Sequence, residues 1–208
     1  MKPHRARKRS YHHGDLRRVL VDATLAMVDE TGPRGFSLRE VARRAGVSHA
    51  APYRHFADRD ALLAAVAEDG FRKLAQAIRS AMDAAPDIVA AFRESGLAYI
   101  AFAQAHPAYY RIMFSDAVPV DPLELGQTVP RFASVQAAAR DTFQALFDGL
   151  TGCQAAGCIR PGDPKDAAMV AWTMCHGLSL LVIDGHLPQR AIPVTFEAMC
   201  FGMMVHPG

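Results

Sequence analysis

Residues 36–63 read FSLREVARRAGVSHAAPYRHFADRDALL, and this stretch decides the fold of the N-terminal part of the chain. Ser37 followed three residues later by Glu40 is a capping-box pattern, so a helix is expected to begin at Leu38. Its apolar positions have the spacing of one helical face: Leu38, Val41, Ala42 and Ala45. Gly46 follows at once, where a left-handed residue commonly ends a helix. The stretch therefore predicts a short helix that stops at a glycine turn.

A second short helix is predicted directly after this turn, over residues 49–56, with Ser48 as its cap. Two short helices joined by a glycine turn are typical of a helix-turn-helix, whose second helix enters the major groove of DNA. The alternative is a solvent-exposed helical hairpin without a role in DNA binding.

The same stretch resembles the DNA-binding segment of the TetR family of bacterial transcription regulators. The resemblance rests on Val41, Ala42, Ala45, Gly46, Val47, Ser48, Tyr53, His55, Phe56, Leu62 and Leu63. Farther along, Trp172, His176 and Gly177 resemble the Trp-His-Gly signature of one type of C-terminal domain in that family. The resemblance implies a homodimer that binds operator DNA through its N-terminal domain and a small molecule through its body.

The charge of the chain is unevenly distributed. Residues 1–60 carry 13 Lys and Arg against 7 Asp and Glu, whereas residues 61–208 carry 10 against 14. A basic end joined to an acidic body indicates a nucleic-acid-binding module fused to a second domain. The net charge of +2 for the whole chain hides this difference.

The composition also bears on the class of protein. Half of the 208 residues are apolar, so the chain is expected to fold, and no apolar run is expected to reach the length of a membrane span. No apolar signal core follows the basic first ten residues, and four cysteines without a tight framework indicate a reducing cytoplasm. The histidines and cysteines lack the spacing of a zinc site, so no metal and no cofactor are expected.

The pattern of apolar residues and helix breakers predicts an all-α chain of about nine helices and no sheet. The expected helices cover about residues 15–31, 38–45, 49–56, 59–82, 87–104, 108–114, 131–150, 164–185 and 194–205. We assign residues 1–58 to a basic arm and DNA-binding domain, and residues 59–208 to an effector-binding and dimerisation domain.

Residues in and around the second short helix are the predicted DNA contacts. The set comprises Arg39, Ser48, His49, Ala50, Ala51, Tyr53, Arg54, His55 and Arg59. The two alanines let the backbone approach the bases, and Arg54 suits a guanine or a phosphate. The resemblance implies that Tyr53 and His55 touch the DNA backbone. Pro52 departs from the aliphatic residue that is commoner there, so a slightly irregular helix is expected.

The first ten residues form a basic arm with two possible roles. Its charged residues are Lys2, Arg5, Arg7, Lys8 and Arg9. Disordered basic arms can enter the minor groove of DNA. A solvated tail that adds only nonspecific attraction is an equally good interpretation.

Apolar and aromatic side chains of the body are the candidate effector contacts, because small-molecule pockets are mostly apolar. They are Phe102, Tyr109, Tyr110, Met113, Phe143, Phe147, Trp172 and His176. The alternative is that they are simply core residues. The last two predicted helices carry apolar residues on more than one side, and the candidate dimer contacts there are Leu180, Ile183, Phe196, Met199 and Met203. Burial of both helices within their own chain is the alternative to dimerisation.

These observations predict a cytoplasmic transcriptional regulator, most simply a repressor, that binds a pseudo-palindromic operator as a homodimer and is released by a small, largely apolar effector. A ligand-free architectural DNA-binding protein is the first alternative. An enzyme that uses the body as its pocket is the second, although no nucleophile–base set, phosphate loop or metal motif supports catalysis.

Overall fold

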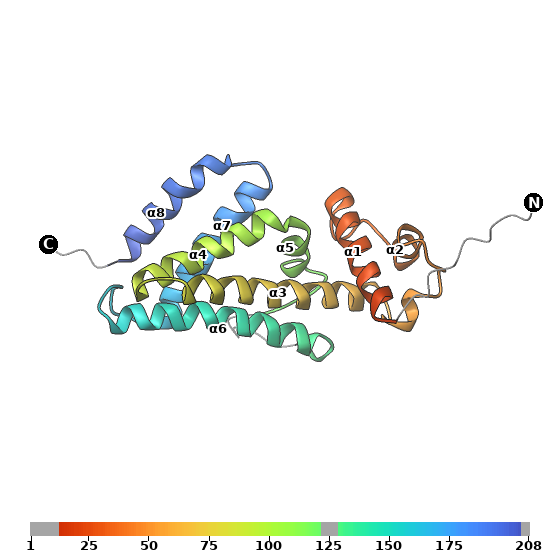
Figure 1. Cartoon of the computed structure of the whole chain (residues 1–208), viewed down its shortest axis with the longest axis horizontal. Coiled ribbons are helices and arrows are strands. Elements are labelled where there is room, and N and C mark those ends of the chain that lie inside the picture. The colour runs from red at the N-terminus through yellow and green to blue at the C-terminus, as the bar shows by residue number, and fades with distance from the viewer. Residues whose placement is uncertain (1–12, 122–128, 205–208) are drawn as a thin grey trace, which may run out of the picture. The chain divides into compact units, whose positions relative to one another are not determined.

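The computed structural model describes residues 13–121 and 129–204 (Figure 1). Within these ranges the chain forms eight α-helices and three short 3₁₀ turns, and no strand is present apart from an isolated bridge between Ile159 and Met204. The predicted all-α class is confirmed. The helices are α1 (His13–Thr31), α2 (Leu38–Arg44), α3 (Arg59–Asp83), α4 (Ile88–Ala105), α5 (Pro107–Met113), α6 (Ala133–Ala155), α7 (Pro164–Ile183) and α8 (Ile192–Met203).

The chain divides into two compact units, Met1–Leu62 and Leu63–Gly208, with the boundary inside α3. We call the first unit the head and the second unit the body, and each is described by itself. The functional assignment of residues 1–58 and 59–208 made from the sequence stays a prediction.

The head is built from α1, α2 and the turn that follows them. α1 packs against α2, and the buried side chains include Leu20, Val28, Val41 and Phe56. The capping box is confirmed: the Ser37 amide donates to Glu40 Oε2 at 2.8 Å, and the Glu40 amide donates to Ser37 Oγ at 3.3 Å.

A glycine turn ends α2 as expected. Gly46 has a φ of +68°, and its amide donates to the Arg43 carbonyl at 3.2 Å. The Val47 amide reaches back to the Ala42 carbonyl at 3.0 Å. This pair of bonds is a Schellman motif, which satisfies the last carbonyls of the helix and reverses the chain.

The prediction of a regular helix over residues 49–56 is wrong. A 3₁₀ turn, Pro52–Arg54, takes its place, preceded by a turn in which the Ala51 amide donates to the Ser48 carbonyl at 2.9 Å. Pro52 explains the difference, because it has no N–H with which to continue an α-helix from Ser48. Ser48 therefore contributes its carbonyl oxygen to this turn.

The body is a bundle in which α4 is central. α4 packs against α5, α6 and α7, while α7 also packs against α6 and α8. The Thr142 hydroxyl of α6 donates to the Phe71 carbonyl of α3 at 2.9 Å, and Arg79 of α3 pairs with Asp141 of α6 at 2.6 Å. The largest fully buried side chains of the body are Tyr99, Tyr110, Phe71, Leu63, Leu74, Ile78, Ile100, Ile112, Met113 and Leu150.

α7 is more apolar than predicted, because no apolar run was expected to reach the length of a membrane span. Its 20 residues include an 18-residue window of mean hydropathy 1.5, so one helix of the described chain does reach the length and composition of a membrane span. Packed helices meet the same criterion, and α7 packs against three helices of the body. Only 28% of this window is buried, however, which leaves much of its apolar surface uncovered within one chain.

Candidate functional site

The turn after Gly46 presents a continuous exposed surface. Ser48, His49, Ala50 and Arg54 are exposed, and the Tyr53 side chain is 52% exposed. Ala51 and His55 are half-buried, while Pro52 and Phe56 point into the head and anchor the turn. A large aromatic side chain that stays half in solvent beside an arginine suits contact with a nucleic acid backbone.

The predicted arginine contacts are placed differently from one another. Arg39 is exposed on α2. Arg59 instead lies 5.8 Å from the centre of the Phe36 ring and donates to the Arg34 carbonyl at 3.4 Å, and it pairs with Asp60 at 3.5 Å. These contacts give Arg59 a structural role in the head, and its phosphate contact stays a prediction.

The remaining charges of the head include one strong pair. Both guanidinium nitrogens of Arg44 reach the Glu30 carboxylate, at 2.6 and 2.7 Å, and the hydrogen bond from Arg44 lowers the pKa of Glu30. Arg44 is therefore committed to holding α2 against α1. The basic arm with Lys2, Arg5, Arg7, Lys8 and Arg9 lies outside the described residues.

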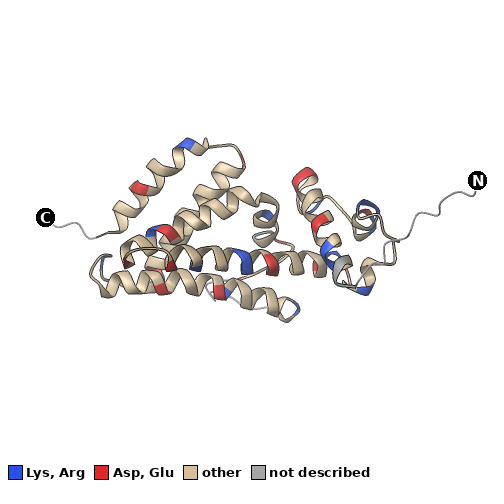
Figure 2. Ribbon diagram, in the orientation of Figure 1, with Lys and Arg blue, Asp and Glu red and all other residues tan. Residues whose placement is uncertain are grey.

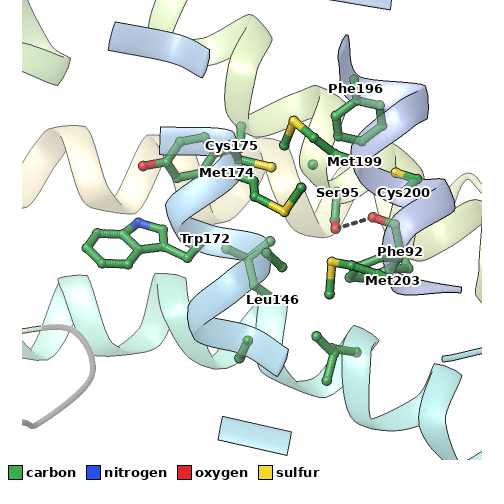
Figure 3. Close-up of a pocket in the computed structure, with 15 residues that line it drawn as sticks. Phe92, Ser95, Leu146, Trp172, Met174, Cys175, Phe196, Met199, Cys200 and Met203 are labelled. Carbon is green, nitrogen blue, oxygen red and sulfur yellow. Dashed lines mark hydrogen bonds between the residues drawn. The ribbon is translucent and has the colours of Figure 1, made fainter. Parts of the chain in front are cut away.

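A cavity lies between α4, α6, α7 and α8 (Figure 3). Its volume is about 40 Å³. Its lining comprises Phe92, Ser95, Gly96, Tyr99, Leu146, Leu150, Ala168, Ala171, Trp172, Met174, Cys175, Phe196, Met199, Cys200 and Met203. The lining is almost wholly apolar, as is usual for sites that bind small molecules.

Of the predicted effector contacts, Trp172 alone lines this cavity. Trp172 and Phe143 also line a smaller hollow of about 10 Å³ between α3, α4, α6 and α7. The others do not line it. Phe102, Tyr109, Tyr110 and Met113 are buried, and Phe147 packs near Leu150. His176 contacts the Tyr110 hydroxyl. The stripe Ala168, Ala171, Trp172 and Cys175 has helical spacing, and this signal was available in the sequence.

His176 belongs to a hydrogen-bonded cluster with two tyrosines. Its Nδ1 lies 2.7 Å from the Tyr110 hydroxyl and 3.0 Å from the Tyr99 hydroxyl, and the two hydroxyls are 3.1 Å apart. Burial lowers the pKa of His176 to about 4, so the ring is neutral at pH 7 and Nδ1 can accept a hydrogen bond from a tyrosine hydroxyl. The Trp172 ring joins this cluster, with its centre 5.3 Å from that of the His176 ring.

The residue before Tyr110 joins a second cluster on the other side of α5. The Tyr109 hydroxyl donates to Asp69 Oδ2 at 2.5 Å, and Lys73 Nζ contacts both the Asp69 carboxylate and the Tyr109 hydroxyl at 2.6 Å. Burial lowers the pKa of Lys73, but its hydrogen bonds with Asp69 and Tyr109 outweigh this effect and raise it. The ammonium group therefore stays charged, and it also faces the Tyr109 ring at 4.3 Å.

The described part of the chain shows neither a cluster of metal-binding side chains nor a disulfide. No group of three or more His, Cys, Asp and Glu side chains gathers there, and all four cysteines are free. Burial raises the pKa of Cys175 to about 12 and that of Cys153 to about 11. Both thiols therefore stay protonated at neutral pH, which disfavours reaction.

The predicted dimer contacts fall into two groups. Phe196 is only 3% exposed and packs within its own chain against α4, beside Gly96. Leu180, Ile183, Met199 and Met203 are half-buried, and the two methionines line the cavity. The large apolar side chains that stay exposed on these helices are Val170, Leu181, Val194 and Phe201.

Comparison with known proteins gives a consistent result along the chain. A family model described as "Bacterial regulatory proteins, tetR family" matches residues 20–66, and one described as "Tetracyclin repressor-like, C-terminal domain" matches residues 92–203. The chain is 28% identical over 199 residues to the HTH-type transcriptional regulator BetI of Klebsiella pneumoniae (strain 342), which covers 83% of this chain and 94% of BetI.

Solved structures show the same relationship. A protein of unknown function from Rhodococcus sp. RHA1 is 34% identical, with a TM-score of 0.76 over 95% of this chain and 100% of that one. The ketosteroid transcriptional regulator KstR2 of Mycobacterium tuberculosis shares the fold at 19% identity, with a TM-score of 0.69 over 91% of this chain and 95% of KstR2. The chain belongs to the TetR family and is a DNA-binding transcriptional regulator, not an enzyme.

Proposed function

We propose that this regulator is a homodimeric repressor that leaves its operator when a small, largely apolar effector enters the body. The observation that carries the proposal is the exposed turn in the head, where Tyr53 and Arg54 stand in solvent beside His49 and Ala50. Two copies related by a two-fold axis would place two such turns about 34–36 Å apart on a pseudo-palindromic operator.

The surface of α7 and α8 supports dimerisation. Figure 2 shows both helices almost free of charged residues. Val194 is 77% exposed and Phe201 is 65% exposed, while Val170 and Leu181 of α7 are exposed and much of the rest of its apolar window is only half-buried in a single chain. Exposed apolar surface of this kind usually marks a protein interface. A second copy of the chain is the simplest partner, because an isologous contact covers both surfaces at once.

The cavity in the body supports an effector in place of a purely architectural role. An architectural protein needs no hollow, whereas this body keeps one lined by flexible and aromatic side chains. The effector must bind the released state more tightly than the DNA-bound state if it is to shift the balance between them.

α5 offers a route from the cavity to α3. On one side Tyr110 joins the cluster with Tyr99 and His176, and Trp172 of that cluster lines the cavity. On the other side Tyr109 is tied to Asp69 and Lys73 of α3. A displacement of Trp172 by an effector would thus be passed through two adjacent tyrosines to the helix whose first residues belong to the head. We infer that these bonds bias α3 between its bound and released states.

A salt-titrated gel shift on the DNA upstream of its own gene tests the regulator with Tyr53→Ala and Arg54→Ala. We expect each substitution to weaken operator binding about tenfold or more, since each removes a contact at the DNA surface. Arg160→Ala, an exposed arginine of the body, is the matched control and should bind as the parent chain does. Equal binding to random and upstream duplexes, or equal losses in the control, would contradict the proposal.

The single tryptophan of the chain gives a test of the route through α5 that needs no effector. Coupling is reciprocal, so the operator duplex should change the fluorescence of Trp172 if head and cavity are linked. Tyr109→Phe removes the hydrogen bond to Asp69, and it should abolish that change although the variant still binds the operator. A fluorescence change that survives in Tyr109→Phe would show that the signal takes another path.

A further inference from the structure

Sulfur atoms make up an unusual share of the cavity lining. Met174 and Cys175 come from α7, and Met199, Cys200 and Met203 come from α8. Figure 3 shows these side chains arranged around the hollow together with the aromatic rings. The rings that share the lining are those of Phe92, Tyr99, Trp172 and Phe196. Thioethers and thiols are polarisable, and sulfur makes favourable contacts with the edges and faces of aromatic rings.

The polar groups of the lining already have partners. The Ser95 hydroxyl donates to the Phe92 carbonyl at 2.6 Å (Figure 3). The Tyr99 hydroxyl is engaged with Tyr110 and His176. Among the described residues, no Lys, Arg, Asp or Glu lines the cavity. An ionised group placed here would be buried without a built counter-charge, which is costly.

The thiols and the nearest ion pair do not alter this picture. Burial raises the pKa of Cys175 to about 12 and also raises that of Cys200, so neither supplies a thiolate at neutral pH. Arg93 approaches Cys200, but it pairs with the Glu197 carboxylate of α8. The lining therefore offers soft, uncharged contact surface and no free ionic group.

The size of the hollow suits a small ring with some adjustment of the lining. One water needs roughly 10–15 Å³ on the same kind of measure, so about 40 Å³ corresponds to a few water-sized groups. Methionine side chains have several rotatable bonds and adapt to irregular ligands. Three methionines and the half-buried Trp172 give the cavity room to widen around a ligand.

We propose that this cavity binds an uncharged aromatic ring, which the sulfur atoms of α7 and α8 and the surrounding aromatic side chains select over saturated rings and over carboxylates. The inference rests on the proposed effector function and names its ligand class. Ser95 and Tyr99 then contribute apolar surface to the site, and ligand recognition comes from Met174, Met199 and the aromatic rings.

Isothermal titration calorimetry of the full chain with benzene, cyclohexane and benzoate tests the proposal. The three probes share a six-membered ring and differ in aromaticity and charge. We expect benzene to bind roughly tenfold more tightly than cyclohexane, as two or more sulfur–aromatic contacts would give, and benzoate to show no binding. Cyclohexane binding as tight as benzene, benzoate binding as tight as benzene, or no binding of any probe would overturn the proposal.

Paired methionine variants assign the selectivity to sulfur. Met174→Leu combined with Met199→Leu keeps the apolar volume but removes two thioethers, so the preference for benzene over cyclohexane should shrink several-fold. Met27→Leu, buried in the head, is the matched control and should leave the preference unchanged. An unchanged preference in the paired variant would overturn the role of sulfur. Operator binding is measured separately by gel shift, so a failure here is distinct from a failure of the regulator proposal.

Discussion

The hydrogen bonds that shape the head and those that shape the body differ in how far apart along the chain their partners lie. In the head, the bonds that shape α2 and its turn join residues three to five apart, such as Ser37 with Glu40 and Ala42 with Val47. In the body, the Tyr99 hydroxyl meets His176 across 77 residues, and the Thr142 hydroxyl meets Phe71 across 71. Bonds between near neighbours leave motifs of fixed spacing in the sequence. Bonds between distant residues leave no such motif in one sequence.

This contrast fits the functions proposed for the two units, which are DNA binding by the head and effector binding by the body. A DNA-reading surface needs a turn of fixed shape, and short-range bonds fix that shape whatever the rest of the chain does. A body that binds the proposed effector would need helices that respond to one another, and bonds between distant helices would provide that coupling. Substitutions in the two units should therefore differ in how far their effects spread.

Gly96→Ala in the body should have the largest effect on stability. A Cβ there would lie 2.7 Å from Cε2 and 2.9 Å from Cζ of Phe196, a ring that is 3% exposed and cannot move aside freely. The expected cost is about 1–3 kcal/mol, measured by urea unfolding, because overpacking forces α4 and α8 apart. Gly202→Ala in α8 meets open space within the chain and should be neutral or slightly stabilising. Equal effects of the two substitutions would show that α4 and α8 do not pack this closely.

The same contrast explains what the sequence could predict. The capping box, Gly46 and Asp58 each act within a few residues, and the boundaries of α2 and α3 follow from them. Pro52 marks a departure that the sequence shows, but the expected slight irregularity understates its effect, since the loss of one N–H converts the second helix into a 3₁₀ turn. Trp172 is conspicuous in the sequence as the single tryptophan, whereas Ser95 and Met174 meet at the cavity only when α4 and α7 have packed.

The pH dependence of stability should show the next largest effect, and it belongs to the body. Burial lowers the pKa of His176 to about 4 from an ordinary value of 6.5. Between these values the unfolded chain holds a proton at this residue and the folded chain does not, so stability falls as pH drops from 6.5 towards 4. The full pKa difference would correspond to about 3.4 kcal/mol, and because His176 is only half-buried, solvent screening reduces the contribution to roughly 2 kcal/mol, which is fully present above pH 6.5.

Urea unfolding of the parent chain and of His176→Gln at several pH values between 7 and 4 measures this contribution. Glutamine can still accept a hydrogen bond from Tyr110 but does not titrate in this range. The free energy of unfolding of the variant should therefore fall less steeply than that of the parent. Parallel profiles would show that His176 is hydrated in the folded chain and would break its link with the two tyrosines.

Ser37→Ala in the head should have the smallest effect, and its effect should stay local. The substitution removes the side-chain oxygen that accepts from the Glu40 amide, which typically costs about 1 kcal/mol at a helix start. Amide hydrogen exchange should speed up about fivefold in α2, as a loss of that size predicts, and remain unchanged in α4 and α7. Ser80→Ala replaces an exposed serine inside α3 that caps no helix, and amide exchange in α3 should slow slightly or stay unchanged, because Ala has the higher helix propensity. Faster exchange throughout the body in Ser37→Ala would mean that the two units share one cooperative structure, and the distinction between short-range and long-range support would then fail.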